Sequence, residues 1–464
     1  MPDRPAVPQA ASPSNQRAPA LSGQLQRVAA CVKAVEQGRS LTDSLAAVDP
    51  AWRPGVQALS FEVLRRLGLA RALLSALATR RPDPPVRALL HTALALLQAP
   101  AAPEEAPPDG VPPRPRYTDH TLVNEAVEAS KRDPGTRRQS GFINACLRRY
   151  LRESEALLAQ VRGLPEARWN HPGWWIERLQ HDHPADWEGI LDAANRPAPM
   201  ALRVNRRRTD RDRYAAELAA AGLPARPFAA DGLVLERPQP VTRLPGFDLG
   251  LCSVQDAAAQ MAAPLLLQDM DLSSRPRVLD ACAAPGGKTA HLLELADLDL
   301  LALDVDDGRC DRIRQNLQRL GLQARVLCAD AARPATWWDG RAFDAILLDA
   351  PCTASGIVRR HPDVRWLRRP GDVEQLARVQ RALLEALWPL LRPGGRLLYA
   401  TCSVFREEGD GQVQAFLARH TDAVLRPAAG HLLPGTAVAG GQFKDNVPGG
   451  HDGFFYARID KAGG

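Results

Sequence analysis

Apolar residues recur at helical spacing through the first third of the chain, from about residue 23 to 152. A Pro-rich stretch at residues 99–115 interrupts the pattern and predicts an exposed loop. We therefore predict an all-α domain over residues 23–160, preceded by a flexible tail over residues 1–22 that is rich in Pro, Ala and Ser. One apolar stripe that would share a single helix face consists of Val28, Cys31, Val32 and Val35.

In the second half of the chain the pattern changes to short apolar runs separated by helical segments. A strand at residues 200–205, a helix at 213–221 and a strand at 232–235 predict a small α+β linking domain over residues 165–245. The strands that we predict after it occupy residues 277–280, 300–304, 324–328, 343–349, 395–400 and 453–458, with helices such as 308–320 and 373–391 between them. Buried strands that alternate with helices predict an α/β domain over residues 246–464, with a doubly wound, mostly parallel sheet.

Composition narrows the class of protein but does not decide its function. The net charge of +6 favours a nucleic-acid partner, but it also fits a chain that is generally rich in Arg, Ala, Leu and Pro. Arg203 and the run Arg206 to Arg208 have two open interpretations, RNA contact or a solvated edge. No apolar stretch approaches the roughly 20 residues that a membrane helix needs, and no signal peptide is apparent. We expect a soluble, cytoplasmic monomer.

Residues suited to ligand binding follow the predicted strands, which is where open α/β sheets place their sites. The first strand runs into a Gly-rich string, Asp280 to Thr289, whose glycines let the backbone approach a ligand closely. This string is neither a P-loop nor a dinucleotide fingerprint. Asp304 follows the second strand and suits a ribose diol, and Asp330 follows the third and suits an adenine edge. Acids at successive strand ends favour a nucleoside ligand over simple helix caps.

Two of the 8 cysteines stand out by their positions. Cys352 and Cys402 follow the fourth and fifth strands at the predicted catalytic edge. A thiolate there suits methylation at C5 of a pyrimidine, because C5 becomes nucleophilic only after a nucleophile has added to C6. Asp349 is placed to hold the N3 and N4 edge of the base. No Cys/His cluster has zinc-ligand spacing, so we expect no metal. The cysteines that we interpret as inert filler are Cys31, Cys146, Cys310 and Cys328.

At these residues the chain resembles the bacterial 16S rRNA (cytosine-C5)-methyltransferase B family, within the Sun-type group of RNA methyltransferases. The resemblance covers nearly everything from about residue 23 to 460, and residues 141–149 resemble the end of a NusB-like helical domain. It implies a Rossmann-like catalytic domain behind a NusB-like domain that binds RNA. The strings that carry the resemblance are Asp280 to Thr289, Leu348 to Cys352, Ser355 to Asp363, Tyr399 to Ser403 and Asp452 to Phe455.

The resemblance also implies the partners and the role of each site residue. The substrate would be a cytosine of small-subunit ribosomal RNA, with Cys402 as the nucleophile and Cys352 assisting release of the methylated product. Asp349 would lie near both the base and the cofactor. The cofactor would be S-adenosylmethionine, bound by Cys282, Ala283, Ala284, Pro285, Gly286, Gly287, Lys288, Asp304, Asp330 and Asp349.

Two alternatives stay open. The first is a methyltransferase that acts on another RNA or on DNA; enzymes that methylate exocyclic amines are disfavoured, because they need no thiol. The second is a catalytically inactive, NusB-like RNA-binding factor. The presence of both thiols and all the strand-end acids argues against this second alternative.

Overall fold

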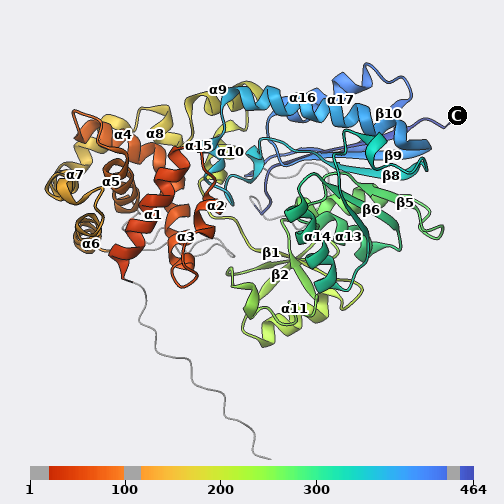
Figure 1. Ribbon diagram of the computed structural model, residues 1–464, viewed down its shortest axis with the longest axis horizontal. Coiled ribbons are helices and arrows are strands. Elements are labelled where there is room, and N and C mark those ends of the chain that lie inside the picture. The colour runs from red at the N-terminus through yellow and green to blue at the C-terminus, as the bar shows by residue number, and fades with distance from the viewer. Residues whose placement is uncertain (1–19, 99–116, 436–449, 464) are drawn as a thin grey trace, which may run out of the picture.

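A computed structural model describes residues 20–98, 117–435 and 450–463 of the chain. A helical domain, a small antiparallel sheet and a large mixed sheet covered by helices follow one another along the chain (Figure 1). The Pro-rich loop predicted at 99–115 lies outside the described residues, as does most of the predicted tail. The boundary of that tail is wrong by two residues, because the first helix begins at Leu21 and Ser22 is already buried in it.

The helical domain is built from seven helices among the described residues. Their apolar stripes meet in one core, in which Val28, Leu64 and Leu90 are fully buried. The helix α7 ends at Val161, and no strand lies among the described residues before it. The helices are α1 (Leu21–Glu36), α2 (Leu41–Ala46), α3 (Arg53–Arg65), α4 (Leu67–Leu77), α5 (Pro84–Leu97), α6 (Asp119–Arg132) and α7 (Ser140–Val161).

A four-stranded antiparallel sheet in the order β2-β3-β1-β4 forms the second part. One strand of this sheet, β4 (Cys252–Val254), lies beyond the predicted boundary at residue 245 and pairs with β1. The helices α9 and α10, which we placed in this linking domain, share a core with Val404 and Phe405 of the catalytic domain. The elements before β4 are α8 (Pro165–Trp169), α9 (Gly173–Asp182), α10 (Trp187–Ala194), β1 (Ala201–Val204), α11 (Arg211–Ala220), β2 (Ala225–Phe228) and β3 (Gly232–Leu235).

The central sheet has seven strands in the order β10-β11-β9-β8-β5-β6-β7. The five strands from β9 to β7 are parallel, and β11 and β10 complete the sheet as antiparallel strands. The predicted α/β fold class with a mostly parallel sheet is therefore confirmed. The strands are β5 (Arg277–Asp280), β6 (Asp299–Asp304), β7 (Arg325–Cys328), β8 (Phe343–Asp349), β9 (Leu391–Thr401), β10 (Ala423–Leu432) and β11 (Phe454–Lys461).

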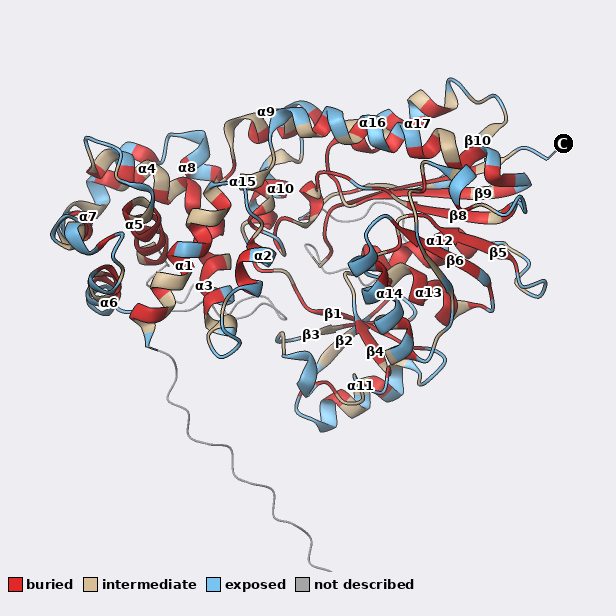
Figure 2. Cartoon of the chain, viewed as in Figure 1, coloured by how far each residue is buried: buried red, intermediate tan, exposed pale blue. Residues whose placement is uncertain are grey.

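Helices cover both faces of this sheet, as its alternating side chains require. On β9, Leu398 and Ala400 pack toward α12 and α13, whereas Leu397 and Tyr399 pack toward α16 and α17. Buried residues accordingly run along the strands (Figure 2). None of the helices in the described residues is long and apolar enough to cross a membrane. The covering helices are α12 (Ala262–Leu267), α13 (Gly287–Leu295), α14 (Asp307–Leu320), α16 (Pro370–Leu387) and α17 (Asp410–Leu417).

The helical domain is joined to the catalytic domain through the short helix α15 (Val364–Leu367). Just before it, a carboxylate oxygen of Asp363 accepts a hydrogen bond from the N–H of Leu41 at 2.9 Å. The indole of Trp366 donates to the carbonyl of Leu64 at 2.8 Å. The two domains therefore contact each other directly, through buried hydrogen bonds and apolar packing.

Candidate active site

The Gly-rich loop at residues 281–286 connects the end of β5 to the start of α13. Its backbone is tied to the next strand, because the N–H of Ala283 donates to the carbonyl of Leu303 at 2.8 Å. At Gly286 the φ angle is +92°, and an added Cβ would lie 3.2 Å from the Cα of Ile313 on α14. A side chain at this position would be strained and crowded, so glycine keeps the loop tight and leaves the N-terminus of α13 open.

Two acids lie at the ends of β6 and β8, the strands on either side of β5. Asp304 ends β6, is buried, and accepts a hydrogen bond from the N–H of Ala284 at 3.2 Å. Asp349 ends β8, and its Oδ2 lies 2.5 Å from Nζ of Lys288 at the start of α13. Burial lowers the pKa of Lys288, but the charge and hydrogen bond of Asp349 more than reverse this, so the net pKa is raised. Lys288 therefore stays an ammonium ion.

A third acid, Asp280, is fully buried beneath the loop. Its Oδ2 accepts a hydrogen bond from the hydroxyl of Thr289 at 2.7 Å, and Oδ1 has no partner among the described residues. Burial raises the pKa of Asp280 to about 7, and the negative charge of Asp349 adds to the effect. Burial likewise raises the pKa of Cys282, which lies in electrostatic range of all three acids. The acids thus converge on the loop that follows β5.

Asp330, the remaining predicted acid, lies at the next strand end along the same edge, after β7. Its side chain is 44 % exposed and pairs with Arg333 at 3.4 Å. It also accepts a hydrogen bond from the N–H of Ala332 at 2.9 Å. No described contact joins it to the Gly-rich loop, so it stands apart from the three converging acids.

Cys352 and Cys402 lie side by side, with 3.4 Å between their sulfur atoms. Cys352 is buried and Cys402 is partly exposed. The contact with Cys402, together with burial, raises the pKa of Cys352 well above its ordinary value. Cys352 therefore remains a thiol that can donate a hydrogen bond to Cys402. The ammonium of Lys288 interacts electrostatically with Cys402, and such a cation stabilises a thiolate.

A buried acid that the sequence patterns did not single out, Glu408, holds the two cysteine loops together. Its carboxylate accepts hydrogen bonds from the N–H of Thr353 at 2.8 Å, from the hydroxyl of Thr353, and from the hydroxyl of Ser403 at 2.7 Å. Thr353 and Ser403 directly follow Cys352 and Cys402 in the chain. Burial raises the pKa of Glu408, because its neighbours are neutral donors that offset the burial only in part.

The string at residues 355–363 also has a structural role at this edge. Arg359 and Arg360 both donate through Nε to the carboxylate of Asp452. A second group of Arg360, Nη2, donates to Asp256 at 2.8 Å. These charge-assisted bonds attach the loop after Cys352 to the segment that leads into β11.

Both interpretations of Arg203 are wrong, because its side chain is buried and contacts neither solvent nor an exposed face. Its Nε and Nη2 donate to the two carboxylate oxygens of Glu294 on α13, at 2.8 and 2.9 Å. Its Nη1 donates to the carbonyl of Gly287 at 3.0 Å. Arg207, from the same basic run, donates to the carbonyl of Ala296 at 2.9 Å. These arginines attach the small sheet to the helix that follows the Gly-rich loop.

The interpretation of Cys328 as buried filler is also wrong, since it is exposed at the end of β7; Cys31, Cys146 and Cys310 are buried. Among the described residues no group of three or more His, Cys, Asp or Glu side chains is arranged to hold a metal ion. The described residues at this edge offer thiols, carboxylates, the ammonium of Lys288, and guanidinium groups such as that of Arg309, which pairs with Asp304 at 3.3 Å.

Comparison with known proteins identifies two matching domain families. Residues 267–460 match the family of the 16S rRNA methyltransferase RsmB/F, and residues 171–242 match the ferredoxin-like domain of RsmF/B-like methyltransferases. The chain is 46% identical over 349 residues to the ribosomal RNA small subunit methyltransferase B of Vibrio cholerae, an alignment that covers 75% of this chain and 78% of that protein.

Two solved structures share the fold. The crystal structure of PH0851 superimposes with a TM-score of 0.72 at 24% identity, covering 94% of this chain and 99% of that one. A methyltransferase homologue from Pyrococcus horikoshii superimposes with a TM-score of 0.53 at 29% identity, covering 64% of this chain and 97% of that one.

Proposed function

Because the chain belongs to the 16S rRNA methyltransferase RsmB/F family, we propose that it transfers a methyl group from S-adenosylmethionine to C5 of a cytosine in small-subunit ribosomal RNA. The observation that carries this proposal is the pair of thiols, 3.4 Å apart, beside a partly buried ammonium at the carboxyl edge of the sheet. Methylation of an exocyclic amine or of a ribose would need neither thiol.

The residues around the Gly-rich loop fit a nucleoside cofactor that carries a positive charge. Asp304 is a buried carboxylate at a strand end, where a ribose diol can donate to it. The missing Cβ at Gly286 leaves room for Ile313 of α14, so the loop can turn tightly into α13 beside the acids. Asp280 and Asp349 add negative charge beside the loop. When bound, S-adenosylmethionine supplies an electrophilic methyl group on a sulfonium.

Cys402 acts as the nucleophile. Its thiolate adds to C6 of the cytosine, which makes C5 electron-rich and able to accept the methyl group. The ammonium of Lys288 lies within electrostatic range of Cys402. After methylation, a base removes the proton from C5, the C6–S bond breaks, and the electron pair returns to the sulfur of Cys402.

Cys352 assists the last step. Its raised pKa keeps it protonated beside Cys402, so it can donate a hydrogen bond to the departing sulfur and help break the C6–S bond. Asp349 contacts Lys288, and its side chain is 26 % exposed, so its carboxylate is accessible to a substrate. That carboxylate can accept a hydrogen bond from the N4 amino group of cytosine. Asp330, just after the end of β7, can accept a hydrogen bond from the adenine of the cofactor.

The experiment that tests this function compares the wild-type chain with Cys402→Ser on unmodified small-subunit ribosomal RNA. We expect the variant to lose at least about 10³-fold in methyl transfer, because a hydroxyl is a far weaker nucleophile than a thiolate. Its affinity for S-adenosylmethionine should be unchanged, since the loop is intact. Methyl transfer is measured with labelled cofactor, and C5 is verified by nucleoside analysis.

If Cys402→Ser turned over at the wild-type rate, Cys402 would not be the nucleophile. If the chain methylated DNA or other RNAs in preference to small-subunit RNA, the proposed substrate would be wrong. Cys146→Ser is the matched control, because it removes a buried thiol of the helical domain, and it should retain wild-type turnover.

A further inference from the structure

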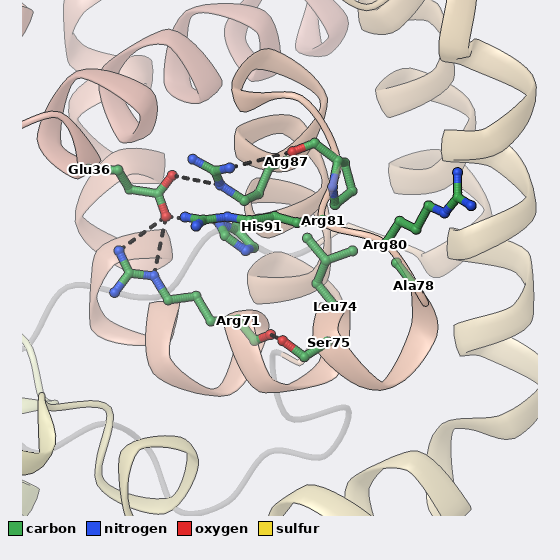
Figure 3. A pocket seen from close by; sticks show the side chains of 10 residues that line it. Glu36, Arg71, Leu74, Ser75, Ala78, Arg80, Arg81, Arg87 and His91 are labelled. Carbon is green, nitrogen blue, oxygen red and sulfur yellow. Dashed lines mark hydrogen bonds and ion pairs between the residues drawn. The ribbon is translucent and has the colours of Figure 1, made fainter.

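A basic pocket in the helical domain takes no part in the chemistry described above. It has a volume of about 500 Å³ and lies among the ends of α1, α4 and α5 and the connection between α4 and α5 (Figure 3). We call it the arginine pocket. The residues on which the argument depends are Glu36, Arg71, Arg80, Arg81, Arg87 and His91.

Among the described residues, Glu36 is the only acid that lines the arginine pocket, and it is surrounded by cations and a histidine. Its Oε1 lies 3.1 Å from Nη2 of Arg71 and 3.1 Å from Nδ1 of His91, and its Oε2 lies 3.6 Å from Nε of Arg87. Figure 3 shows these contacts as dashed lines that converge on Glu36. Burial raises the pKa of Glu36, but His91 and Arg71 outweigh that effect and hold the pKa at about 2.

The arginine pocket carries more positive charge than Glu36 can balance. Four guanidinium groups line the pocket with this carboxylate, and two of them, Arg71 and Arg87, contact it. Burial lowers the pKa of His91, which is therefore neutral at pH 7. Arg80 and Arg81 are exposed, and no partner is recorded for either side chain within the described part of the chain. In Figure 3, Arg80 lies at the end of the pocket away from Glu36. The ion pairs around Glu36 hold α1, α4 and α5 together. Arg80 and Arg81 take no part in these pairs, so their presence in the pocket needs another reason.

Guanidinium groups without a counter-ion suit a phosphate. An arginine stays charged at every physiological pH and presents a planar fork that matches phosphate oxygens. Arg71 uses Nε and Nη2 for Glu36, which leaves its Nη1 for another acceptor. A cavity of about 500 Å³ admits a phosphate together with its sugar.

The position of the arginine pocket connects it with the catalytic domain. The guanidinium of Arg71 lies over the ring of Trp366 in α15, 4.7 Å from the ring centroid. The helix α15 directly follows the string at residues 355–363, which begins three residues after Cys352. A polyanion bound in the pocket would therefore lie beside the junction between the two domains.

We propose that the arginine pocket binds a backbone phosphate of the RNA substrate, away from the methylated base. This inference rests on the proposed function, because that function supplies RNA as the polyanion. Such a contact positions the RNA without reading its sequence. It adds to affinity and to salt dependence, and it leaves the chemical step unchanged.

The test measures the affinity of the full chain for a small-subunit RNA transcript over a range of KCl concentrations. The variant is the double substitution Arg80→Gln and Arg81→Gln, which removes the two unpartnered charges and keeps the cluster around Glu36. The matched control is Arg237→Gln with Arg381→Gln, two exposed arginines outside the pocket. We expect the pocket variant to lower the slope of log K against log[KCl] by about 1. Its kcat at saturating RNA should equal that of the wild type.

Three outcomes would overturn the proposal. One is a pocket variant with the wild-type salt slope and affinity. A second is an equal loss of slope in the control, which would indicate a general effect of net charge. A third is loss of binding to inorganic phosphate with RNA affinity unchanged, which would identify a site for a free anion. A wild-type chain that binds RNA through the pocket but transfers no methyl group would overturn the proposed function and leave this proposal standing.

Discussion

The carboxyl edge of the central sheet and the arginine pocket of the helical domain have opposite charge. At the sheet edge, Asp280, Asp304 and Asp349 converge on a loop that carries one ammonium, Lys288. In the arginine pocket, the described lining residues include four arginines and one acid, Glu36. An acidic edge suits a cofactor with a sulfonium cation, and a basic pocket suits a polyanion. In our two proposals, the cofactor and the RNA backbone therefore bind regions of opposite charge.

Each region also contains a buried acid, and the two acids titrate in opposite directions. Asp280 has a hydroxyl donor and nearby negative charge, so burial prevails and its pKa rises to about 7. Glu36 has cations and a histidine around it, and its pKa falls to about 2. Neighbouring charges therefore decide the sign of the shift when both carboxyl groups are buried.

The largest expected change in unfolding free energy is that of Asp280→Asn, at the sheet edge. The folded pKa of Asp280, about 7, lies above its ordinary value of 3.8, so its contribution to stability is full below 3.8 and is lost as pH rises through 7. We expect the wild type to lose up to roughly 4 kcal/mol from this group between pH 4 and pH 8. Asn cannot ionise, so the variant should lack this loss. The measurement is the difference in unfolding free energy between variant and wild type across that range; a difference that does not change with pH would contradict the account.

A smaller change in unfolding free energy, with the opposite dependence on pH, is expected from Glu36→Gln in the arginine pocket. The folded pKa of Glu36, about 2, lies below its ordinary value of 4.5. The contribution of Glu36 to the stability of the fold is therefore present above pH 4.5 and is lost as pH falls through 2. We expect the variant to be less stable than the wild type by about 3 kcal/mol at pH 7, with the gap closing toward pH 2. Urea unfolding at pH 7, 4 and 2.5 would check this, and an equal gap at all three values would show that Glu36 acts through packing alone.

Much of the central sheet could be predicted because buried parallel strands are continuous apolar runs. The predicted strands at residues 277–280 and 343–349 coincide with β5 and β8. In contrast, β4 has only three residues, and β10 is partly exposed, contains a Pro and changes register between Arg426 and Gly430. Neither strand has an apolar run long enough to mark it in the sequence.

The strand-end residues of the candidate site could be placed in advance, because parallel strands end at one edge of the sheet. Glu408 and Arg203 could not be placed in this way. Glu408 binds Thr353, which lies 55 residues away in the chain, and Arg203 binds Glu294, which lies 91 residues away. A charged side chain is buried only when it has a partner, and a single sequence does not show which distant residue supplies that partner.

The central claim is that Cys402 forms a covalent bond to the target cytosine and that Cys352 helps to break it. The most direct test incubates Cys352→Ala protein with S-adenosylmethionine and unmodified small-subunit ribosomal RNA, and resolves the products on a denaturing gel. The account predicts a slowly migrating protein–RNA adduct that disappears when Cys402 is also replaced by Ala. An adduct that persists in the double variant, or methyl transfer by Cys352→Ala at the wild-type rate with no adduct, would contradict it.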